Sequence, residues 1–352
     1  RQSLYPVTED AVVEGLGMMT DVMNGMGITT AFDASAKEFD MNFIKRTLDR
    51  LAKRGELTVR IVGAATTDSA DDVDRAVDRA EAWGEYIKGD GFHYNALKIF
   101  SDGTLEARTA AMFEDYQGNP GNAGHTIFSE AQLATMMIDA ASRGIDVHVH
   151  ALGERAVHEA LNAVSAAREA HPDSPTNFVL VHIEVIADQD IPRFAELGVY
   201  AQTSPLWFSY DEYGEQFVSD DQFQRYWPVR SLEREGARLA FGSDFPATGL
   251  GIAGMHPLLN IETGHTRQIP GQPDSPVQPR ASERLSLESL IHGYTLGPAQ
   301  MLHMEDRVGS IEVGKKADLV VLDQDIFAID VYAIHRTRVL LTVMDGGIVH
   351  EL

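Results

Sequence analysis

The chain has 352 residues, 44% of them hydrophobic, which is enough to bury the core of one large α/β barrel with an appended domain. Its 53 acidic and 29 basic residues give a formal net charge of −24, which opposes binding to nucleic acid and to anionic membrane surfaces. This acidic excess has two explanations, a well-solvated surface or the attraction of a cationic substrate. Because the chain has no cysteine, a transition metal would have to be held by histidine, carboxylate or modified lysine.

The sequence also limits where the protein works. No apolar run approaches the roughly 18 residues of a membrane-spanning helix, and the first residues lack the basic and then apolar pattern of a secretory signal. We therefore expect a cytoplasmic protein that acts on a small molecule and binds neither membrane nor nucleic acid. Association into a homo-oligomer is left open.

Helix and strand patterns alternate along most of the chain. Helices are expected from apolar residues at helical spacing, and strands from short apolar runs. The expected helices cover residues 10–26, 42–54, 71–88, 129–143, 156–171, 188–197 and 229–235. The expected strands cover residues 27–33, 58–63, 96–100, 147–150, 179–182, 198–202 and 239–244. Seven strands in this rhythm are one short of a closed eight-stranded barrel, and the shortfall lies at the front of the chain.

The last part of the chain changes character. After a helix pattern at 286–299 and a turn-rich link at 308–314, apolar runs at 317–323 and 339–349 predict short β-strands. The second run contains an Asp-Gly-Gly turn suited to a hairpin. The sequence thus predicts a barrel domain over residues 1–305 that lacks its first strand, and part of a small β-sandwich over residues 306–352.

Four metal-capable residues each close an apolar run, namely Lys98, His150, His182 and Asp244. The C-terminal ends of barrel strands converge on one mouth, so four such residues on four strands suggest a metal site. Each residue also has an ordinary explanation. The lysine could pair with a core carboxylate, the histidines could simply pack in the barrel, and the aspartate could cap a turn.

Other residues near these strand ends are candidates for binding substrate. Arg108 could pair with a substrate carboxylate or carbonyl, although a structural salt bridge explains it equally well. Trp207 is expected in a loop that lines the pocket with an apolar wall. His148 precedes His150 by two positions, so it can share the same face of the strand. A methionine and aromatic cluster is either another part of the pocket wall or plain core, and it consists of Met112, Phe113 and Tyr116.

Several motifs follow one another in a specific order along the chain. They are Leu97–Thr104 with Arg108–Ala110, His148–Ala156, Gly242–Pro246 and Gly309–Leu319. Together they resemble the amidohydrolase superfamily, and most closely amidohydrolase family 3, the group that includes N-substituted formamide deformylase-like enzymes. The resemblance implies a (β/α)8 barrel flanked by a β-sandwich, with one or two divalent metal ions, usually Zn²⁺. The superfamily's His-x-His pair of strand 1 has no counterpart here, so the resemblance also implies the C-terminal part of a longer polypeptide.

The resemblance assigns roles to the four strand-end residues. It implies that Lys98 is the carboxylated lysine of strand 4, that His150 and His182 are the histidines of strands 5 and 6, and that Asp244 is the aspartate of strand 8. Zinc lowers the pKa of bound water to about 7. Asp244 would hold that water and pass its proton to the leaving amine. Burial would favour the neutral amine of Lys98, which is the form that takes up CO2 to become a carbamate.

The expected activity is therefore the hydrolysis of C–N bonds in non-peptide amides. Two rivals remain open. One is a non-catalytic binding or regulatory protein on the same scaffold, which the missing strand 1 ligands favour. The other is the hydrolysis of an ester or lactone, which the same metal hydroxide could attack.

Overall fold

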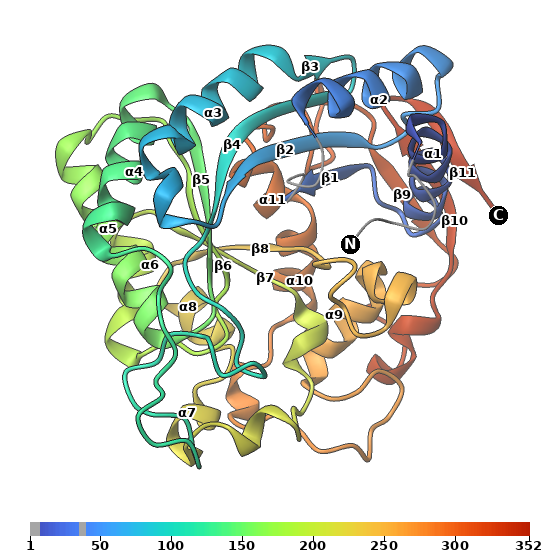
Figure 1. The fold of residues 1–352 in the computed structure, drawn as a ribbon. Helices are drawn as coiled ribbons and strands as arrows, with labels where there is room; N and C mark the ends of the chain where they lie inside the picture. Colours follow the sequence, from blue (N-terminus) through green and yellow to red (C-terminus); the bar gives the residue numbers. More distant parts are fainter. Residues whose placement is uncertain (1–7, 35–39) are drawn as a thin grey trace.

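A parallel sheet of seven strands organises the computed structural model, which describes residues 8–34 and 40–352. The sheet curves as it passes from β1 to β8 (Figure 1). In hydrogen-bonded order the strands are β1 (Thr30–Asp33), β2 (Arg60–Thr67), β4 (Phe92–Phe100), β5 (Asp146–Ala151), β6 (Phe178–His182), β7 (Tyr200–Thr203) and β8 (Arg238–Phe241). A two-residue strand, β3 (Lys88–Gly89), pairs antiparallel with the start of β4. In the described part of the chain β1 and β8 are the two ends of this order, so the expected incomplete barrel is confirmed.

Helices lie along the outside of the curved sheet, as Figure 1 shows for α3 to α6. The α-helices are α1 (Glu9–Gly25), α2 (Met41–Arg54), α3 (Val73–Tyr86), α4 (Glu130–Arg143), α5 (Glu154–Ala170), α6 (Ile191–Glu196), α7 (Asp220–Gln224), α8 (Val229–Arg234), α9 (Pro257–Thr266), α10 (Leu287–Tyr294) and α11 (Leu296–Met301). Short 3₁₀ helices are η1 (Ala70–Asp72), η2 (Asp188–Asp190), η3 (Pro205–Phe208), η4 (Gly214–Gln216), η5 (Gly251–Met255), η6 (Ala281–Glu283) and η7 (Val331–Arg336). Within the described residues, no helix is both long enough and apolar enough to cross a membrane.

Local sequence signals set the ends of several helices. Ser129 caps α4 through a reciprocal capping box with Gln132, and Gly144 ends the helix in the left-handed conformation at φ +68°. The single helix expected over residues 286–299 is wrong, because Thr295 leaves helical geometry and separates α10 from α11. Pro298 then lies in the first turn of α11. Backbone N–H groups in a first turn have no acceptor within the helix, so a proline is tolerated there.

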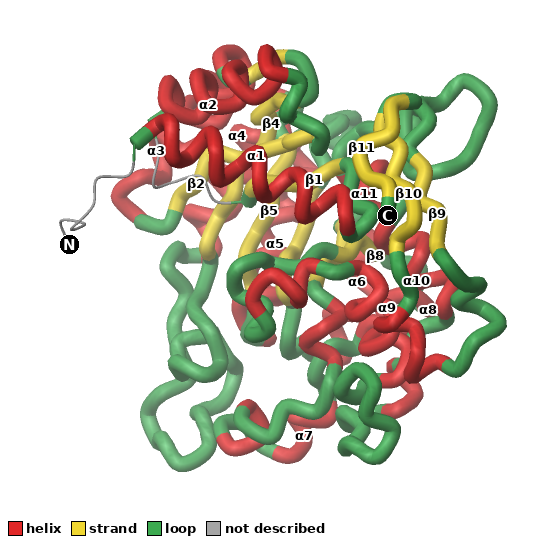
Figure 2. The backbone as a smooth tube through the Cα atoms, turned by 90° about the vertical axis from the view of Figure 1, so that its right-hand side faces the viewer, coloured by secondary structure: helices red, strands yellow, loops and turns green. Residues whose placement is uncertain are grey.

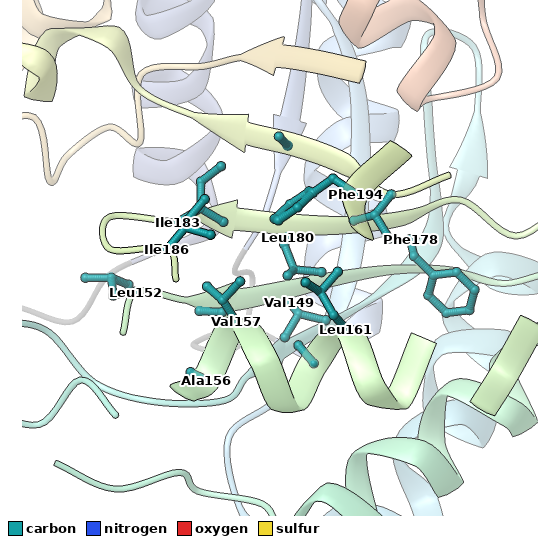
Figure 3. Packing of buried hydrophobic residues seen from close by; sticks show 14 of the residues in the cluster. Val149, Leu152, Ala156, Val157, Leu161, Phe178, Leu180, Ile183, Ile186 and Phe194 are labelled. Atoms are coloured by element: carbon teal, nitrogen blue, oxygen red, sulfur yellow. The ribbon is translucent and has the colours of Figure 1, made fainter. Parts of the chain in front are cut away.

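The two faces of the sheet pack against different layers. On the outer face, Val149 of β5 and Leu180 of β6 lie against Val157 and Leu161 of α5 (Figure 3). On the inner face a separate apolar cluster fills part of the barrel. It consists of Val62, Val179, Val181, Tyr200 and Ala240 from the strands, with Ala299, Met301, Leu302, Met304 and Val308 from α11 and the residues after it. Strands buried on both sides explain the nearly continuous apolar runs in the sequence.

The C-terminal strands form a separate antiparallel sheet of three strands. These are β9 (Leu319–Leu322), β10 (Val339–Met344) and β11 (Gly347–Glu351). The expected hairpin turn is confirmed, since Asp345 and Gly346 have φ values of +53° and +83° between β10 and β11. Helix α1 packs against β10 and β11, and Figure 2 shows it beside this sheet. The domain boundary expected between residues 305 and 306 stays a prediction.

Candidate active site

The parallel register of β4 and β5 places three candidate residues on the inner face of the barrel. Lys98 is the register partner of His148, and Phe100 is the register partner of His150. Because alternate residues of a strand face the same side, these side chains enter the interior together. Lys98 lies two positions inside β4 rather than at its end, since the strand continues to Phe100.

His182 reaches the same site by a different route. Its register partner is Ala151, which lies beside His150 and on the opposite face of β5, so strict alternation would turn His182 outward. The strand ends there, however, with left-handed φ values of +76° at His182 and +46° at Ile183. The imidazoles of His150 and His182 consequently meet edge to face, with 4.6 Å between ring centroids. The expected convergence of these two histidines is therefore seen in the structure.

Burial lowers the pKa of the basic groups in this site. Lys98 is 2% exposed, and this burial lowers its pKa to about 8, while the charge of Asp244 acts in the opposite direction. Burial, together with the Lys98 charge, lowers the pKa of His148 and of His150 to about 3. Burial lowers the pKa of His182 well below its usual range, with His150 and Lys98 adding to the effect. The histidines are thus neutral, which is the protonation state that binds a metal.

The loop after β4 holds the ring of His150. Its Nε2 lies 3.1 Å from the carbonyl oxygen of Gly103 and 3.6 Å from a carboxylate oxygen of Asp102. Its Nδ1 is buried and has no hydrogen-bond partner among the described residues. With the proton on Nε2 donated to Gly103, the lone pair of Nδ1 is available to a ligand.

Asp102 is a site residue that the sequence did not single out, although it lies within the Leu97–Thr104 motif. It is 2% exposed and accepts hydrogen bonds from the backbone N–H groups of Ala111, Leu152 and Gly153 at 2.9 to 3.1 Å. Burial raises its pKa to about 7 against the opposing effect of these hydrogen bonds. Asp102 thus joins the loop after β4 to the turn between β5 and α5. Its position directly after the Lys98 strand, in the Ser-Asp-Gly-Thr motif, was the available signal.

Asp244 and the two expected substrate-binding residues, Trp207 and Arg108, lie in three different surroundings. Asp244 lies three positions beyond the end of β8, in a turn at φ +52°, and is exposed, although surrounding protein still raises the pKa of its carboxyl group. Trp207 lies beside His182, with 5.5 Å between ring centroids. The Arg108 guanidinium packs on the ring of Phe217, 4.8 Å from its centroid.

The remaining candidates differ in their surroundings. His148 stacks on Phe32 of β1 at 4.1 Å between ring centroids and 17° between ring planes, and its buried Nε2 has no hydrogen-bond partner among the described residues. Met112 and Tyr116 are buried in the main core, and the Tyr116 hydroxyl donates to the Ala110 carbonyl at 2.8 Å. Phe113 is 46% exposed. This group is thus core and surface rather than a pocket wall.

The donor set fits a divalent metal in part. His150 and His182 could supply two nitrogen donors from adjacent strands, and a carbamate on Lys98 of the neighbouring β4 would add an oxygen donor. Counting only histidine, aspartate and glutamate, no group of three or more is arranged to hold a metal within residues 8–34 and 40–352. The candidate centre therefore offers some of the donors that a four-coordinate site would need.

The described strands form an incomplete parallel barrel that carries an imidazole pair from two adjacent strands at one end. A family model described as the amidohydrolase family, the group numbered family 3, matches residues 3–350, and the chain belongs to this family. The expected family membership is thereby confirmed.

Individual relatives agree with this assignment. A putative amidohydrolase, YtcJ, from Bacillus subtilis is 32% identical over 278 residues, covering 78% of this chain and 50% of that protein. The N-substituted formamide deformylase of Arthrobacter pascens is 25% identical over 346 residues, covering 97% of this chain and 61% of that protein. The crystal structure of an uncharacterized metal-dependent hydrolase from Pyrococcus horikoshii has the same fold, with a TM-score of 0.74 at 21% identity over 92% of this chain and 62% of that one. The chain thus spans about half to two thirds of the length of these relatives.

Proposed function

We propose that this chain forms the main part of the active site of a metal-dependent hydrolase that cleaves C–N bonds in small, non-peptide amides. One observation carries the proposal. Two buried, neutral imidazoles from adjacent strands meet beside Lys98, and the Nδ1 atom of His150 has no partner among the described residues. Barrel histidines that serve only packing normally have their ring nitrogens satisfied by hydrogen bonds.

In this proposal His150, His182 and a carbamate on Lys98 hold a divalent ion, most simply Zn²⁺, which supplies an activated water when bound. The carbamate forms when the neutral Lys98 amine attacks CO2, so that one N–C bond forms and one proton is released. A buried lysine whose pKa is lowered to about 8 is partly neutral at physiological pH, as this reaction requires.

Asp244 is the proposed proton carrier. Its carboxylate lies within electrostatic reach of Lys98, and its crowded surroundings raise its pKa. A carboxylate with a raised pKa is a better base, so it accepts a proton from the attacking water and delivers it to the leaving nitrogen as the C–N bond breaks. The exposed turn that carries Asp244 leaves its side chain accessible to a substrate.

The proposed substrate class follows from the surroundings of His182. The indole of Trp207 lies beside that imidazole and gives the site an apolar wall. Arg108 is retained as a substrate-binding candidate, although its guanidinium lies on Phe217 in the structure. A small amide with an apolar substituent fits this wall, and N-substituted formamides are the first compounds to assay because a relative is named for their deformylation.

A non-catalytic scaffold is the second candidate function. It is favoured by the absence, among the described residues, of three or more histidine, aspartate or glutamate side chains arranged around one metal position. Under this alternative the buried imidazoles and Lys98 would only support the barrel.

Zinc titration combined with an assay panel tests the two candidates. We expect saturable zinc binding that weakens at least about tenfold in His150→Gln and in His182→Gln, because each change removes one ligand. His292→Gln, an exposed histidine on α10, is the matched control. Turnover of amides above that of matched esters and lactones would support the C–N specificity. Equal zinc binding in all three variants, or no turnover by zinc-loaded protein that includes any native upstream sequence, would overturn the proposal.

A further inference from the structure

A basic pocket lies outside the barrel interior. It has a volume of about 430 Å³ and is walled by the end of α8, the end of α9, the segment from η6 to α10, and η7. Three arginines line it, Arg230, Arg234 and Arg284, together with His265. None of its lining residues is acidic, although the chain as a whole carries a formal net charge of −24. The cationic lining of this pocket therefore contrasts with the net negative charge of the protein.

The arginines of this pocket retain unused hydrogen-bonding capacity. Arg234 is exposed and has no hydrogen bond or ion pair with any described residue, and it follows Arg230 by one helical turn, an arrangement of like charges that destabilises a helix. Arg230 itself pairs with Glu233. Arg284 donates through Nε to the Thr266 carbonyl at 2.8 Å and through Nη2 to Gln268 Oε1 at 3.4 Å, which leaves its Nη1 without a hydrogen-bond partner among the described residues.

Nearby acidic groups do not neutralise the pocket. Glu283 is 3% exposed and turns toward α8, where it accepts hydrogen bonds from the backbone N–H and the hydroxyl of Ser231 at 2.9 and 2.5 Å. Glu288 has its pKa lowered mainly by a hydrogen bond from its own backbone N–H, then by one from the Ser286 hydroxyl, with a smaller contribution from the charge of His265. Besides Glu233, no described carboxylate forms an ion pair with these arginines.

Two buried charged side chains hold the walls together. Arg267 is 0% exposed and donates to the carbonyl oxygens of Tyr226, Trp227 and Pro279 at 3.0 to 3.2 Å, which ties the end of α9 to the start of α8 and to the loop before η6. Glu283 ties η6 to α8 through Ser231. The pocket is therefore held by buried hydrogen bonds before any ligand arrives, which lowers the ordering cost of binding.

Side chains other than arginine complete the lining. The Nδ1 atom of His265 lies 2.8 Å from the Leu285 carbonyl and donates to it, so in the neutral imidazole Nε2 is an acceptor and adds no hydrogen-bond donor to the pocket. The Ser282 hydroxyl has no partner among the described residues, and Tyr332 contributes an aromatic edge whose hydroxyl donates to Gln268 at 2.6 Å. Guanidinium groups together with a hydroxyl donor match the several oxygens of a multiply charged oxyanion.

We propose that this pocket is a binding site for a small molecule that carries a phosphate group. A cavity of about 430 Å³ is much larger than a lone phosphate ion, and Leu285 and Val331 give it an apolar wall for an organic portion. A second pocket, beside α1 and α2, differs in its charge. It contains Arg50 and Arg54, but it is also lined by four carboxylates, those of Asp10, Glu14, Asp21 and Glu56.

Calorimetric titration of the purified chain tests the site with three probes, inorganic phosphate, pyrophosphate and adenosine 5′-monophosphate. Ionic strength is held constant with sodium chloride, because salt screening alone affects a chain of this charge. We expect one saturable site per chain. Tighter binding of the nucleotide identifies an organic phosphate as the ligand, and equal binding of inorganic phosphate identifies the free anion.

Arg234→Gln should weaken this binding by about tenfold or more, because it removes a charge-assisted contact without removing any hydrogen bond within the described chain. Arg54→Gln, in the carboxylate-lined pocket, is the matched control and should leave affinity unchanged. Thermal unfolding of both variants in the absence of probe verifies that they fold. Saturable binding that is equal in Arg234→Gln and in the wild type, or no saturable binding of any of the three probes, would overturn the proposal.

Discussion

Lys98 and His148 are register partners on β4 and β5, and their side chains enter the barrel next to each other with only 2% and 1% exposure. The charge of Lys98 adds to the effect of burial in lowering the pKa of His148 to about 3. His148 is therefore neutral at neutral pH. It stacks on Phe32, and its buried Nε2, like the Nδ1 of His150, has no hydrogen-bond partner among the described residues.

The first prediction concerns the cost of burying Lys98. In metal-free protein prepared without CO2, Lys98→Met should raise the free energy of unfolding by about 1–3 kcal/mol, because it removes a poorly solvated basic group and keeps a similar volume. Urea unfolding followed by circular dichroism measures the change. Lys88→Met, at an exposed position, is the control. A marked loss of stability in Lys98→Met would show that the amine makes an essential structural contact.

The second prediction concerns the carbamate. Zinc-loaded protein should carry the extra mass of one CO2 in native mass spectra, and Lys98→Ala should lose that mass together with most zinc binding. Short carboxylic acids should restore part of the zinc binding, because they supply the missing oxygen donor. An unmodified Lys98 in zinc-replete protein would contradict the assignment.

The third prediction concerns Asp244. Asp244→Asn should lower kcat/KM for a test amide by about 100-fold or more, because an amide side chain cannot carry the proton. The melting temperature should change little, since the residue lies in an exposed turn. Asp274→Asn, another exposed aspartate, provides the comparison. Activity within about threefold of the wild type would remove Asp244 from the mechanism.

The fourth prediction concerns the close approach at Gly153. A Cβ atom there would lie 2.1 Å from the carbonyl oxygen of Ala111, so Gly153→Ala should separate the two loops that Asp102 joins. We expect a loss of about 1–3 kcal/mol in stability and weaker zinc binding at the neighbouring His150. Gly15→Ala in α1, where the new methyl meets nothing within 4 Å, should instead be neutral or stabilising by up to about 1 kcal/mol. Equal stability of the two variants would show that this backbone contact relaxes without cost.

The fifth prediction concerns pH. His303 Nε2 lies 3.0 Å from a carboxylate oxygen of the buried Asp146, and this hydrogen bond raises the pKa of His303. The pKa of His303 is thus higher in the folded state than in the unfolded state. The stabilisation from its hydrogen bond with Asp146 is therefore fully present at pH values below the unfolded-state pKa, and it is lost as the pH rises through the folded-state pKa. The free energy of unfolding should therefore differ between wild type and His303→Asn most below about pH 6.5 and least at alkaline pH. The difference should stay below about 1 kcal/mol because the histidine is partly exposed.

Urea titrations at several pH values measure that difference. His292→Asn, in which an exposed histidine is changed, should show no such dependence on pH. A difference that grows with rising pH would contradict the prediction.

The parts of the fold that depend on regular periodicity could be predicted from the sequence. Alternation along β4 and β5 was enough to place Lys98, His148 and His150 near one another, and the Asp345-Gly346 pair was enough to predict the last hairpin. Helix α9 was not predicted. It is buried on most sides and includes polar residues that are satisfied internally, so it has no apolar stripe to recognise.

The site depended more on long-range geometry. Asp102 is defined by backbone N–H groups that lie up to 51 positions away in the sequence, which no local pattern encodes. Arg108 was a candidate by its position after a strand, but its side chain packs on Phe217, more than one hundred positions further along the chain. Contacts of this kind arise only once the loops between the strands have folded.

The left-handed backbone at His182 and Ile183 also limits how this centre could be transferred to another protein. The imidazole faces its neighbour because the chain turns at that point, against the alternation of the strand. Grafting only Phe178–His182 onto a different barrel would deliver the ring to the outer helices. A successful transplant would have to include His182 and Ile183, the two residues with positive φ. It would also need the backbone N–H of Trp227, which donates to the Glu184 carbonyl at 2.8 Å just beyond the turn.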